Sequence, residues 1–148
     1  MTGINNSLDA LATIGTNAKL KLRNGKVTKV AHQAELEEQA ALIEWADKTV
    51  IDGIKIGNYL LHIPNEGKRG SKAARDAKRL GMKKGVHDLF LALPRGSYSG
   101  LWIEMKAVNG KASTAQLEWQ SLMRGAGYRA EICYGFCGAK IEIERYLK

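Results

Sequence analysis

Residues 101–106 read Leu-Trp-Ile-Glu-Met-Lys, and residues 85–88 upstream read Gly-Val-His-Asp. The first stretch is predicted to form a strand. Because side chains on a strand alternate between its two faces, Glu104 and Lys106 point the same way. Asp88 opens a second apolar run. If the two runs pair as a hairpin, two carboxylates and one ammonium converge on one spot.

This trio has a chemical use. Two carboxylates with free oxygens are the ligands that a hard divalent cation such as Mg²⁺ prefers. A lysine beside a metal-bound water suggests hydrolysis of a phosphodiester. The alternative is an exposed charge pair between Glu104 and Lys106, which is common on a solvated sheet. Trp102 lies on the same face and argues against plain solvation there.

The composition points to a polyanionic partner. The 148 residues carry 23 Lys and Arg against 15 Asp and Glu, a formal net charge of +8. Nucleic acid is the default partner of such a chain, an anionic membrane surface is the second, and solubility alone is the alternative. We expect no bilayer-spanning segment and no secretory signal. Cys133 and Cys137 fit thiols in a reducing cytoplasm better than a disulfide framework or a zinc site.

The N-terminal residues differ in pattern from the rest of the chain. Residues 19–30 alternate apolar and charged side chains around Asn24-Gly25, which predicts a hairpin. We therefore divide the chain into a basic arm or hairpin over residues 1–31 and one domain over residues 32–148. The arm has three readings: a DNA contact, an edge that pairs with another subunit, or a solvated hairpin packed on the domain.

Hydrophobic periodicity predicts a central mixed sheet flanked by helices, an α/β fold. A helix begins near residue 32 and ends before Asp52-Gly53, and further helices span about 71–80, 113–124 and 139–147. Strands are expected over 59–63, 89–93, 101–106 and 128–134. Ser113 and Gln116 have the spacing of a capping box at the start of the third helix.

Six segments in this order resemble the VRR-NUC family of the PD-(D/E)xK nuclease superfamily, in particular its small phage and bacterial stand-alone type. They are residues 35–39, 63–65, 85–88, 102–106, 113–116 with Trp119, and 127–128. The likeness covers roughly residues 35–147. A lone Asp…Glu-x-Lys is a weak signal, whereas six ordered segments are specific. The resemblance implies a restriction-endonuclease-like core.

The resemblance also implies roles for the central residues. Asp88 and Glu104 would ligate one or two Mg²⁺ or Mn²⁺ ions, with help from the backbone carbonyl of Met105. Lys106 would hold and help deprotonate the attacking water, or stabilise the phosphorane. Glu35 resembles the helical acid that reaches the metal directly or through water. Because Glu38 lies near the same helix face, it stays open as the alternative, and a merely solvated acidic face is a third reading.

Further residues are assigned by position in the same pattern. Gln116 would orient water or phosphate, or only close the capping box. The DNA contacts would come from Asn65, which is otherwise a turn residue, and from the densest basic stretch: Lys68, Arg69, Lys72, Arg75, Lys78, Arg79, Lys83 and Lys84. His87 replaces the usual proline of the family, and its ring either contacts phosphate or points away from the site as a neutral group.

The sequence therefore predicts a metal-dependent, structure-selective DNA endonuclease. The family implies branched DNA, such as Holliday junctions or flaps, and a homodimer. A non-catalytic basic nucleic-acid-binding module is the alternative function. A structural or regulatory phage protein with incidental charge is a third.

Overall fold

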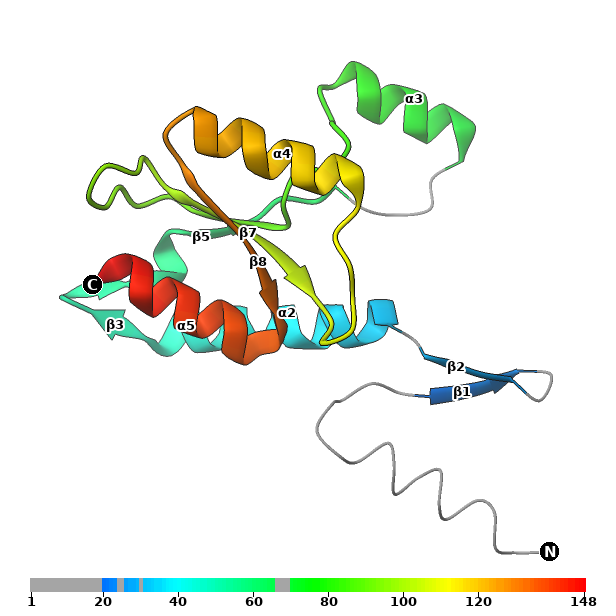
Figure 1. The fold of residues 1–148 in the computed structure, drawn as a ribbon, viewed down its shortest axis with the longest axis horizontal. Coiled ribbons are helices and arrows are strands. Elements are labelled where there is room, and N and C mark those ends of the chain that lie inside the picture. Colours follow the sequence, from blue (N-terminus) through cyan, green and yellow to red (C-terminus); the bar gives the residue numbers. More distant parts are fainter. Residues whose placement is uncertain (1–19, 24–25, 30, 66–69) are drawn as a thin grey trace, which may run out of the picture.

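The computed structural model describes residues 20–23, 26–29, 31–65 and 70–148 (Figure 1). The elements in chain order are β1 (Leu20–Arg23), β2 (Lys26–Lys29), α2 (Ala31–Lys48), β3 (Val50–Ile51), β4 (Ile54–Lys55), the 3₁₀ turn η1 (Ile56–Asn58), β5 (Leu60–His62), α3 (Ser71–Arg79), β6 (Leu89–Leu91), β7 (Leu101–Lys106), α4 (Thr114–Gly125), β8 (Arg129–Tyr134) and α5 (Gly135–Leu147). Within these ranges no helix combines the length and apolar character that crossing a membrane requires.

A four-stranded mixed sheet organises the domain, as predicted. Its strand order is β5-β6-β7-β8; the first two pairings are antiparallel and β7 runs parallel to β8. Leu89 of β6 faces Ile103 of β7. One step further along the same register, Asp88 comes opposite Glu104. The expected hairpin between residues 89–93 and 101–106 is therefore confirmed.

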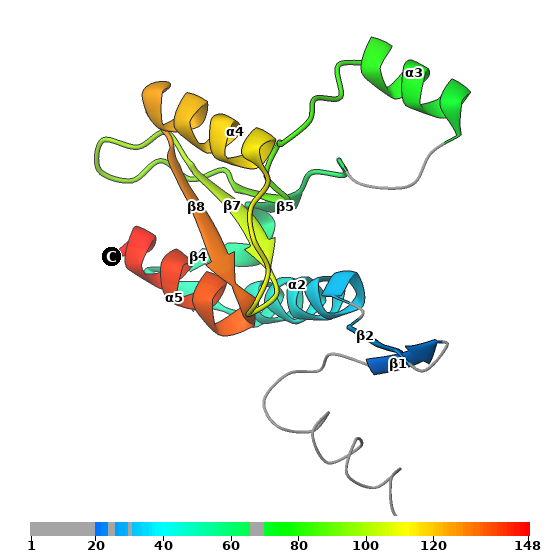
Figure 2. The same cartoon turned by 45° about the vertical axis from the view of Figure 1, so that its right-hand side comes forward.

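Helices cover both faces of this sheet (Figures 1 and 2). Helices α2 and α5 lie on one face and enclose the main core, which includes Leu42, Leu89, Leu101, Ile103, Met105 and Ile143. Helix α4 lies on the other face. There the Trp102 ring packs edge-on against Trp119 of α4, with 5.5 Å between the ring centroids, and lies 4.4 Å from the Phe90 ring. The residues of β7 thus alternate between an apolar core and the layer under α4.

The helix starts combine local and distant signals. The capping box at α4 is present: Gln116 donates its backbone N–H to Ser113 Oγ, and Ser113 donates its own to Gln116 Oε1. Helix α5 begins at Gly135, four residues before the predicted start. The carboxylate of Glu38 accepts the Phe136 N–H there, over 2.6 Å. A cap supplied from another helix has no signature in the local sequence, which explains the early start.

Two short hairpins flank α2. Strands β1 and β2 pair antiparallel on either side of residues 24–25, which confirms the N-terminal hairpin. The boundary between an arm and a domain near residue 31 stays a prediction. Helix α2 ends at Lys48, and the pair β3–β4, which the sequence analysis missed, turns at Asp52 and Gly53. Both turn residues have positive φ, the conformation that favours Asp-Gly in two-residue hairpins.

Candidate active site

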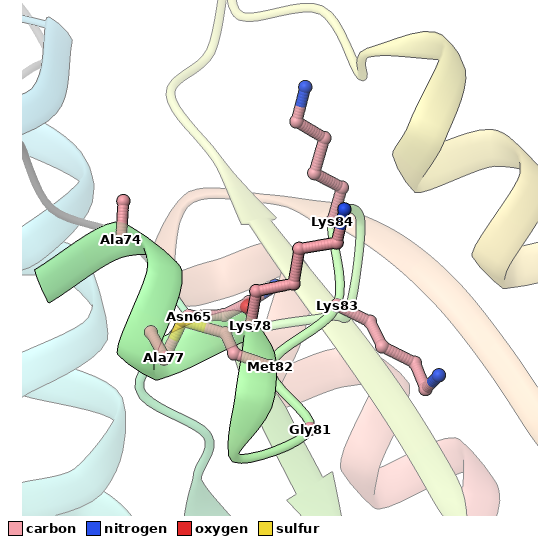
Figure 3. Close-up of a pocket in the computed structure, with 8 residues that line it drawn as sticks. All are labelled: Asn65, Ala74, Ala77, Lys78, Gly81, Met82, Lys83 and Lys84. Atoms are coloured by element: carbon pink, nitrogen blue, oxygen red, sulfur yellow. The ribbon is translucent and has the colours of Figure 1, made fainter. Parts of the chain in front are cut away.

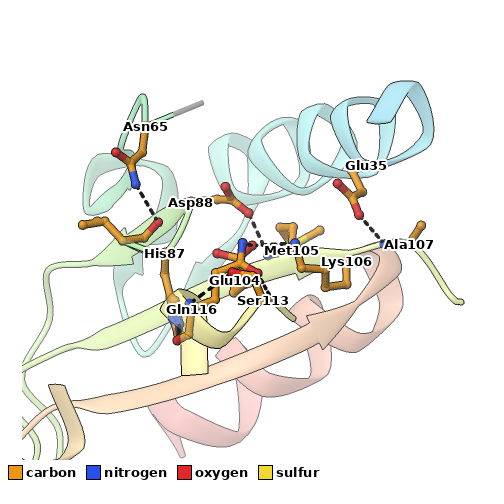
Figure 4. Close-up of polar contacts among 11 residues, drawn as sticks. Glu35, Asn65, His87, Asp88, Glu104, Met105, Lys106, Ala107, Ser113 and Gln116 are labelled. Carbon is orange, nitrogen blue, oxygen red and sulfur yellow. Dashed lines mark hydrogen bonds and ion pairs between the residues drawn. The ribbon is translucent and has the colours of Figure 1, made fainter. Parts of the chain in front are cut away.

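The β6–β7 hairpin brings Asp88, Glu104 and Lys106 together (Figure 4). Lys106 Nζ lies 2.8 Å from Glu104 Oε1. Asp88 Oδ2 accepts the Met105 N–H over 2.9 Å. Glu104 is 0% exposed and Lys106 is 8% exposed. An ordinary solvated charge pair is therefore excluded, because both partners are buried.

The charge on Lys106 is set by its acidic neighbours. Burial by itself would lower the pKa of the ammonium. The hydrogen bond to Glu104, together with the negative charges of Glu104, Glu35 and Asp88, outweighs burial and raises the Lys106 pKa above its usual range. Lys106 is therefore a charged hydrogen-bond donor at neutral pH in this arrangement.

Helix α2 brings one of its two candidate acids to this cluster. Glu35 Oε1 accepts the Ala107 N–H over 3.2 Å, directly after Lys106 at the end of β7. Glu38 instead binds the backbone at the start of α5. The structure thus places Glu35 beside the predicted site and Glu38 at a helix cap.

Gln116 closes the predicted capping box and also contacts Glu104, a contact that the sequence did not predict. Its side-chain Oε1 closes the capping box, while its Nε2 donates a hydrogen bond to Glu104 Oε1. The side chain is buried between α4 and β7. One amide therefore fixes the start of α4 and the orientation of the Glu104 carboxylate.

His87 lies beneath α4 and away from solvent. The ring is 0% exposed, and its Nε2 lies 3.3 Å from the Gln116 carbonyl oxygen. Burial lowers the His87 pKa to about 4, so the ring is neutral at pH 7. A fully buried ring offers no surface to a DNA phosphate, and the reading of His87 as a phosphate contact is wrong.

Gly85 makes this close packing possible. Its φ is +81°, a conformation that L side chains rarely adopt. A Cβ at this position would overlap the backbone of Ala115 in the first turn of α4. The chain can therefore pass directly beneath α4 on its way to Asp88 because residue 85 has no side chain.

His62 of β5 and Asn65 after it support the segment that carries Asp88. Asn65 Nδ2 donates to the Val86 carbonyl over 3.3 Å. His62, which the sequence analysis missed, places Nδ1 3.1 Å from the Asp88 carbonyl and 2.9 Å from Gln39 Nε2. Its one sequence signal is its position next to residues 63–65, because the contact itself depends on how β5 pairs with β6.

The predicted DNA-contacting cations lie on α3 and the segment after it. Lys72, Arg75, Lys78, Arg79, Lys83 and Lys84 are all exposed. Lys68 and Arg69 lie outside the described residues. Within α3 no residue is buried, and the helix stands away from the sheet (Figures 1 and 2). The basic residues therefore form a separate surface, at the edge of the domain.

The residues at the centre of the site fit the divalent cation that the resemblance implies. Among the described residues, no three His, Cys, Asp or Glu side chains are grouped closely enough to form a complete metal cage. Asp88, Glu104 and the Met105 carbonyl nevertheless offer the oxygen donors that a hard cation prefers. Three acids act on the Lys106 charge, so the local balance is negative. This donor set suits a hard divalent cation.

Comparisons with known proteins agree with this geometry. The family model "VRR-NUC domain" matches residues 33–137. A solved structure titled "VRR_NUC domain protein" superposes with a TM-score of 0.67 at 31% sequence identity, over 76% of this chain and 87% of that chain. No curated protein matches the chain. The chain therefore belongs to the VRR-NUC family of the PD-(D/E)xK nuclease superfamily, which gives it a nuclease-type function.

Proposed function

We propose that the protein is a Mg²⁺- or Mn²⁺-dependent endodeoxyribonuclease that hydrolyses phosphodiester bonds in DNA. The cluster of Asp88, Glu104 and Lys106, in which Glu104 and Lys106 are buried, is the observation that carries this proposal. Buried acids beside a DNA-binding surface would repel phosphate unless a cation lay between them. A chain with a net charge of +8 has no other evident use for that arrangement.

Each residue of the cluster has a defined task. Asp88, Glu104 and the Met105 carbonyl would hold the cation, and Glu35 would complete its surroundings. When bound, the cation supplies Lewis-acid activation of water and neutralises charge on the scissile phosphate. Lys106, held in place by Glu104, presents an ammonium that orients the attacking water or a phosphate oxygen.

The surrounding residues keep this geometry fixed. Gln116 orients the Glu104 carboxylate from α4. Asn65 and His62 hold the backbone on either side of His87, at Val86 and Asp88. Glu104 lies within β7, Asp88 directly precedes β6 and Glu35 lies on α2. Neighbouring elements support these positions, as precise catalytic geometry requires.

Family membership points to the DNA structure and the oligomeric state, and the free thiols point to the cellular compartment. We infer that the substrate is branched DNA, such as a Holliday junction or a flap. We also infer that the protein acts as a homodimer, because a two-fold axis would place two sites on two strands. We infer a location in the cytoplasm of a bacterial or phage-infected cell; the two free thiols support a reducing compartment.

Cleavage of a substrate panel tests the proposed function. End-labelled duplex, single strand, 5′ and 3′ flaps and a four-way junction are incubated with Mg²⁺, Mn²⁺ or EDTA. We expect metal-dependent cleavage that is fastest on a branched substrate. Salt-sensitive binding without turnover in either metal would favour the non-catalytic binding module instead.

A further inference from the structure

We propose that the cavity between α3 and residues 81–84 seats one unpaired nucleotide of the DNA substrate. The inference rests on the proposed nuclease function, because it assigns one part of the DNA substrate to a pocket outside the candidate active site. The nucleotide base would lie against the apolar part of the wall, and its phosphates would lie on the lysines at the rim.

The cavity has room for a nucleotide, and its lining has chemistry that suits one. The volume is about 820 Å³, which is within the range of small-molecule sites. Ala74, Ala77 and Met82 supply apolar surface, and Asn65 supplies an amide. Lys78, Lys83 and Lys84 extend around them (Figure 3). A phosphate alone would need the lysines but not the apolar wall.

The charge around the cavity favours a nucleic acid over other occupants. Residues 70–84 contain six Lys and Arg, against one acid, Asp76. Asp76 is not among the lining residues. The phosphates of a nucleic acid complement this excess of positive charge. Every base also has a flat apolar face, so the cavity could accept a base of any sequence.

The concave shape favours an unpaired nucleotide over a duplex. A duplex presents its phosphates on a convex surface and keeps its bases stacked inside. A base can reach an apolar cavity only when it has left the stack, as at the single-stranded arm of a branch. The cavity would therefore distinguish a fork from a blunt duplex.

One side chain links the cavity to the segment that leads into β6. Asn65 lines the cavity and also donates to the Val86 carbonyl, two residues before Asp88. Lys83 and Lys84 lead into the same segment. A nucleotide held in the cavity would thus lie next to the backbone that positions Asp88, and would help to set where a branched strand is cut.

Filling the cavity tests this inference. Ala77→Phe places a ring in the cavity from the half-buried face of α3, while Ala73→Phe adds the same ring at an exposed position that does not line it. Binding is measured in EDTA, with a forked duplex and a blunt duplex of equal length. In the fork, 2-aminopurine replaces one base at a time along the unpaired arm.

We expect wild-type protein to raise 2-aminopurine fluorescence at one position near the junction. Ala77→Phe should abolish that signal and weaken fork binding by roughly tenfold, which corresponds to about 1.4 kcal/mol of binding free energy. Blunt-duplex binding should not change. Ala73→Phe should resemble wild type on both DNAs.

A second pair of variants separates the cavity from general charge. Lys78→Ala and Lys72→Ala remove the same charge from α3, but only Lys78 lines the cavity. Lys78→Ala alone should lower the preference for the fork. Equal behaviour within both pairs, or no fluorescence change in wild type, would overturn the cavity proposal and leave the nuclease proposal standing. If no substrate of the panel is cleaved, the nuclease proposal is overturned instead. The binding and fluorescence measurements still test the cavity proposal in that case.

Discussion

At the scale of single residues, burial distinguishes the Glu104–Lys106 pair from an ordinary surface ion pair. Glu104 and Lys106 would contribute little as exposed neighbours on a strand. In this structure they are buried, and Gln116 contacts the same carboxylate oxygen. A buried ion pair is costly to desolvate, so its presence is better explained by function than by stability. The strand pattern predicted the pairing, but burial depends on α4.

Neutralising the two acids of α2 should affect different properties: cleavage for Glu35 and stability for Glu38. Glu35→Gln removes a charge beside Lys106 and should reduce cleavage by roughly 10–100-fold, as is typical for residues that support a metal site. Glu38→Gln removes a charge at the start of α5 and should lower the free energy of unfolding by about 1 kcal/mol, with cleavage unchanged. Single-turnover cleavage and urea unfolding measure the two effects. Loss of cleavage in Glu38→Gln alone would reverse the assignment.

The buried His87 should make the protein less stable in mild acid. Its pKa is about 4 in the folded protein and near 6.5 when exposed. Above pH 6.5 both states are neutral. As pH falls from 6.5 toward 4, the unfolded state gains a proton that the folded state excludes, so stability is lost over that window.

The expected loss between pH 7.5 and pH 5 is roughly 2 kcal/mol from this residue. Urea unfolding at the two pH values measures it. Because carboxylates also titrate near pH 5, His87→Gln serves as the reference and should lose about 2 kcal/mol less than wild type over the same interval. Equal losses in the two proteins would contradict the assignment.

At the scale of elements, the approach of residues 85–88 to α4 should be sensitive to one methyl group. Gly85 and Gly127 both have positive φ, but a Cβ at Gly85 would overlap the Ala115 backbone, whereas at Gly127 it would meet open space. Gly127→Ala should cost about 1–2 kcal/mol from backbone strain alone. Gly85→Ala should cost more and should also slow cleavage, because α4 carries Gln116. Thermal unfolding and cleavage of both variants test this, and equal costs would contradict the close packing.

The elements also show what can be predicted from the sequence. Apolar runs and capping signals predicted β6, β7, β8 and the start of α4 because those signals are local. The start of α5 was missed because its cap, Glu38, is 98 residues away from Phe136. The pair β3–β4 was missed because each strand has two residues, too few for a pattern.

In the candidate site too, local patterns were predictable from the sequence and contacts between distant segments were not. Asp88, Glu104 and Lys106 could be brought together from the hairpin pattern alone. The contact of His62 with the Asp88 carbonyl could not, because it requires the register in which His62 faces Leu89. Contacts that depend on the pairing of distant segments have no local signature.

At the scale of the whole molecule, positive charge is concentrated on an exposed helix. Arg75 on α3 should contact phosphate. Lys55 is also exposed, but it belongs to β4, which lies well away from α3 (Figure 2). Arg75→Ala should therefore reduce the slope of log binding constant against log salt concentration by about 1, and Lys55→Ala should leave it unchanged. DNA affinities between about 50 and 200 mM salt measure the slope. Equal slopes in the two variants would show that binding does not use α3.

The central claim is that Asp88 and Lys106 perform metal-dependent hydrolysis. The most direct test is single-turnover cleavage of a labelled branched DNA by wild type, Asp88→Asn and Lys106→Gln. Asp76→Asn, on the exposed α3, is the matched control for lost charge. We expect wild type and Asp76→Asn to cleave with Mg²⁺ or Mn²⁺ and not with EDTA. Asp88→Asn and Lys106→Gln should be slower by roughly 10³-fold or more, with DNA affinity in EDTA retained. Cleavage that persists in EDTA, or that is undiminished in both site variants, would contradict the account.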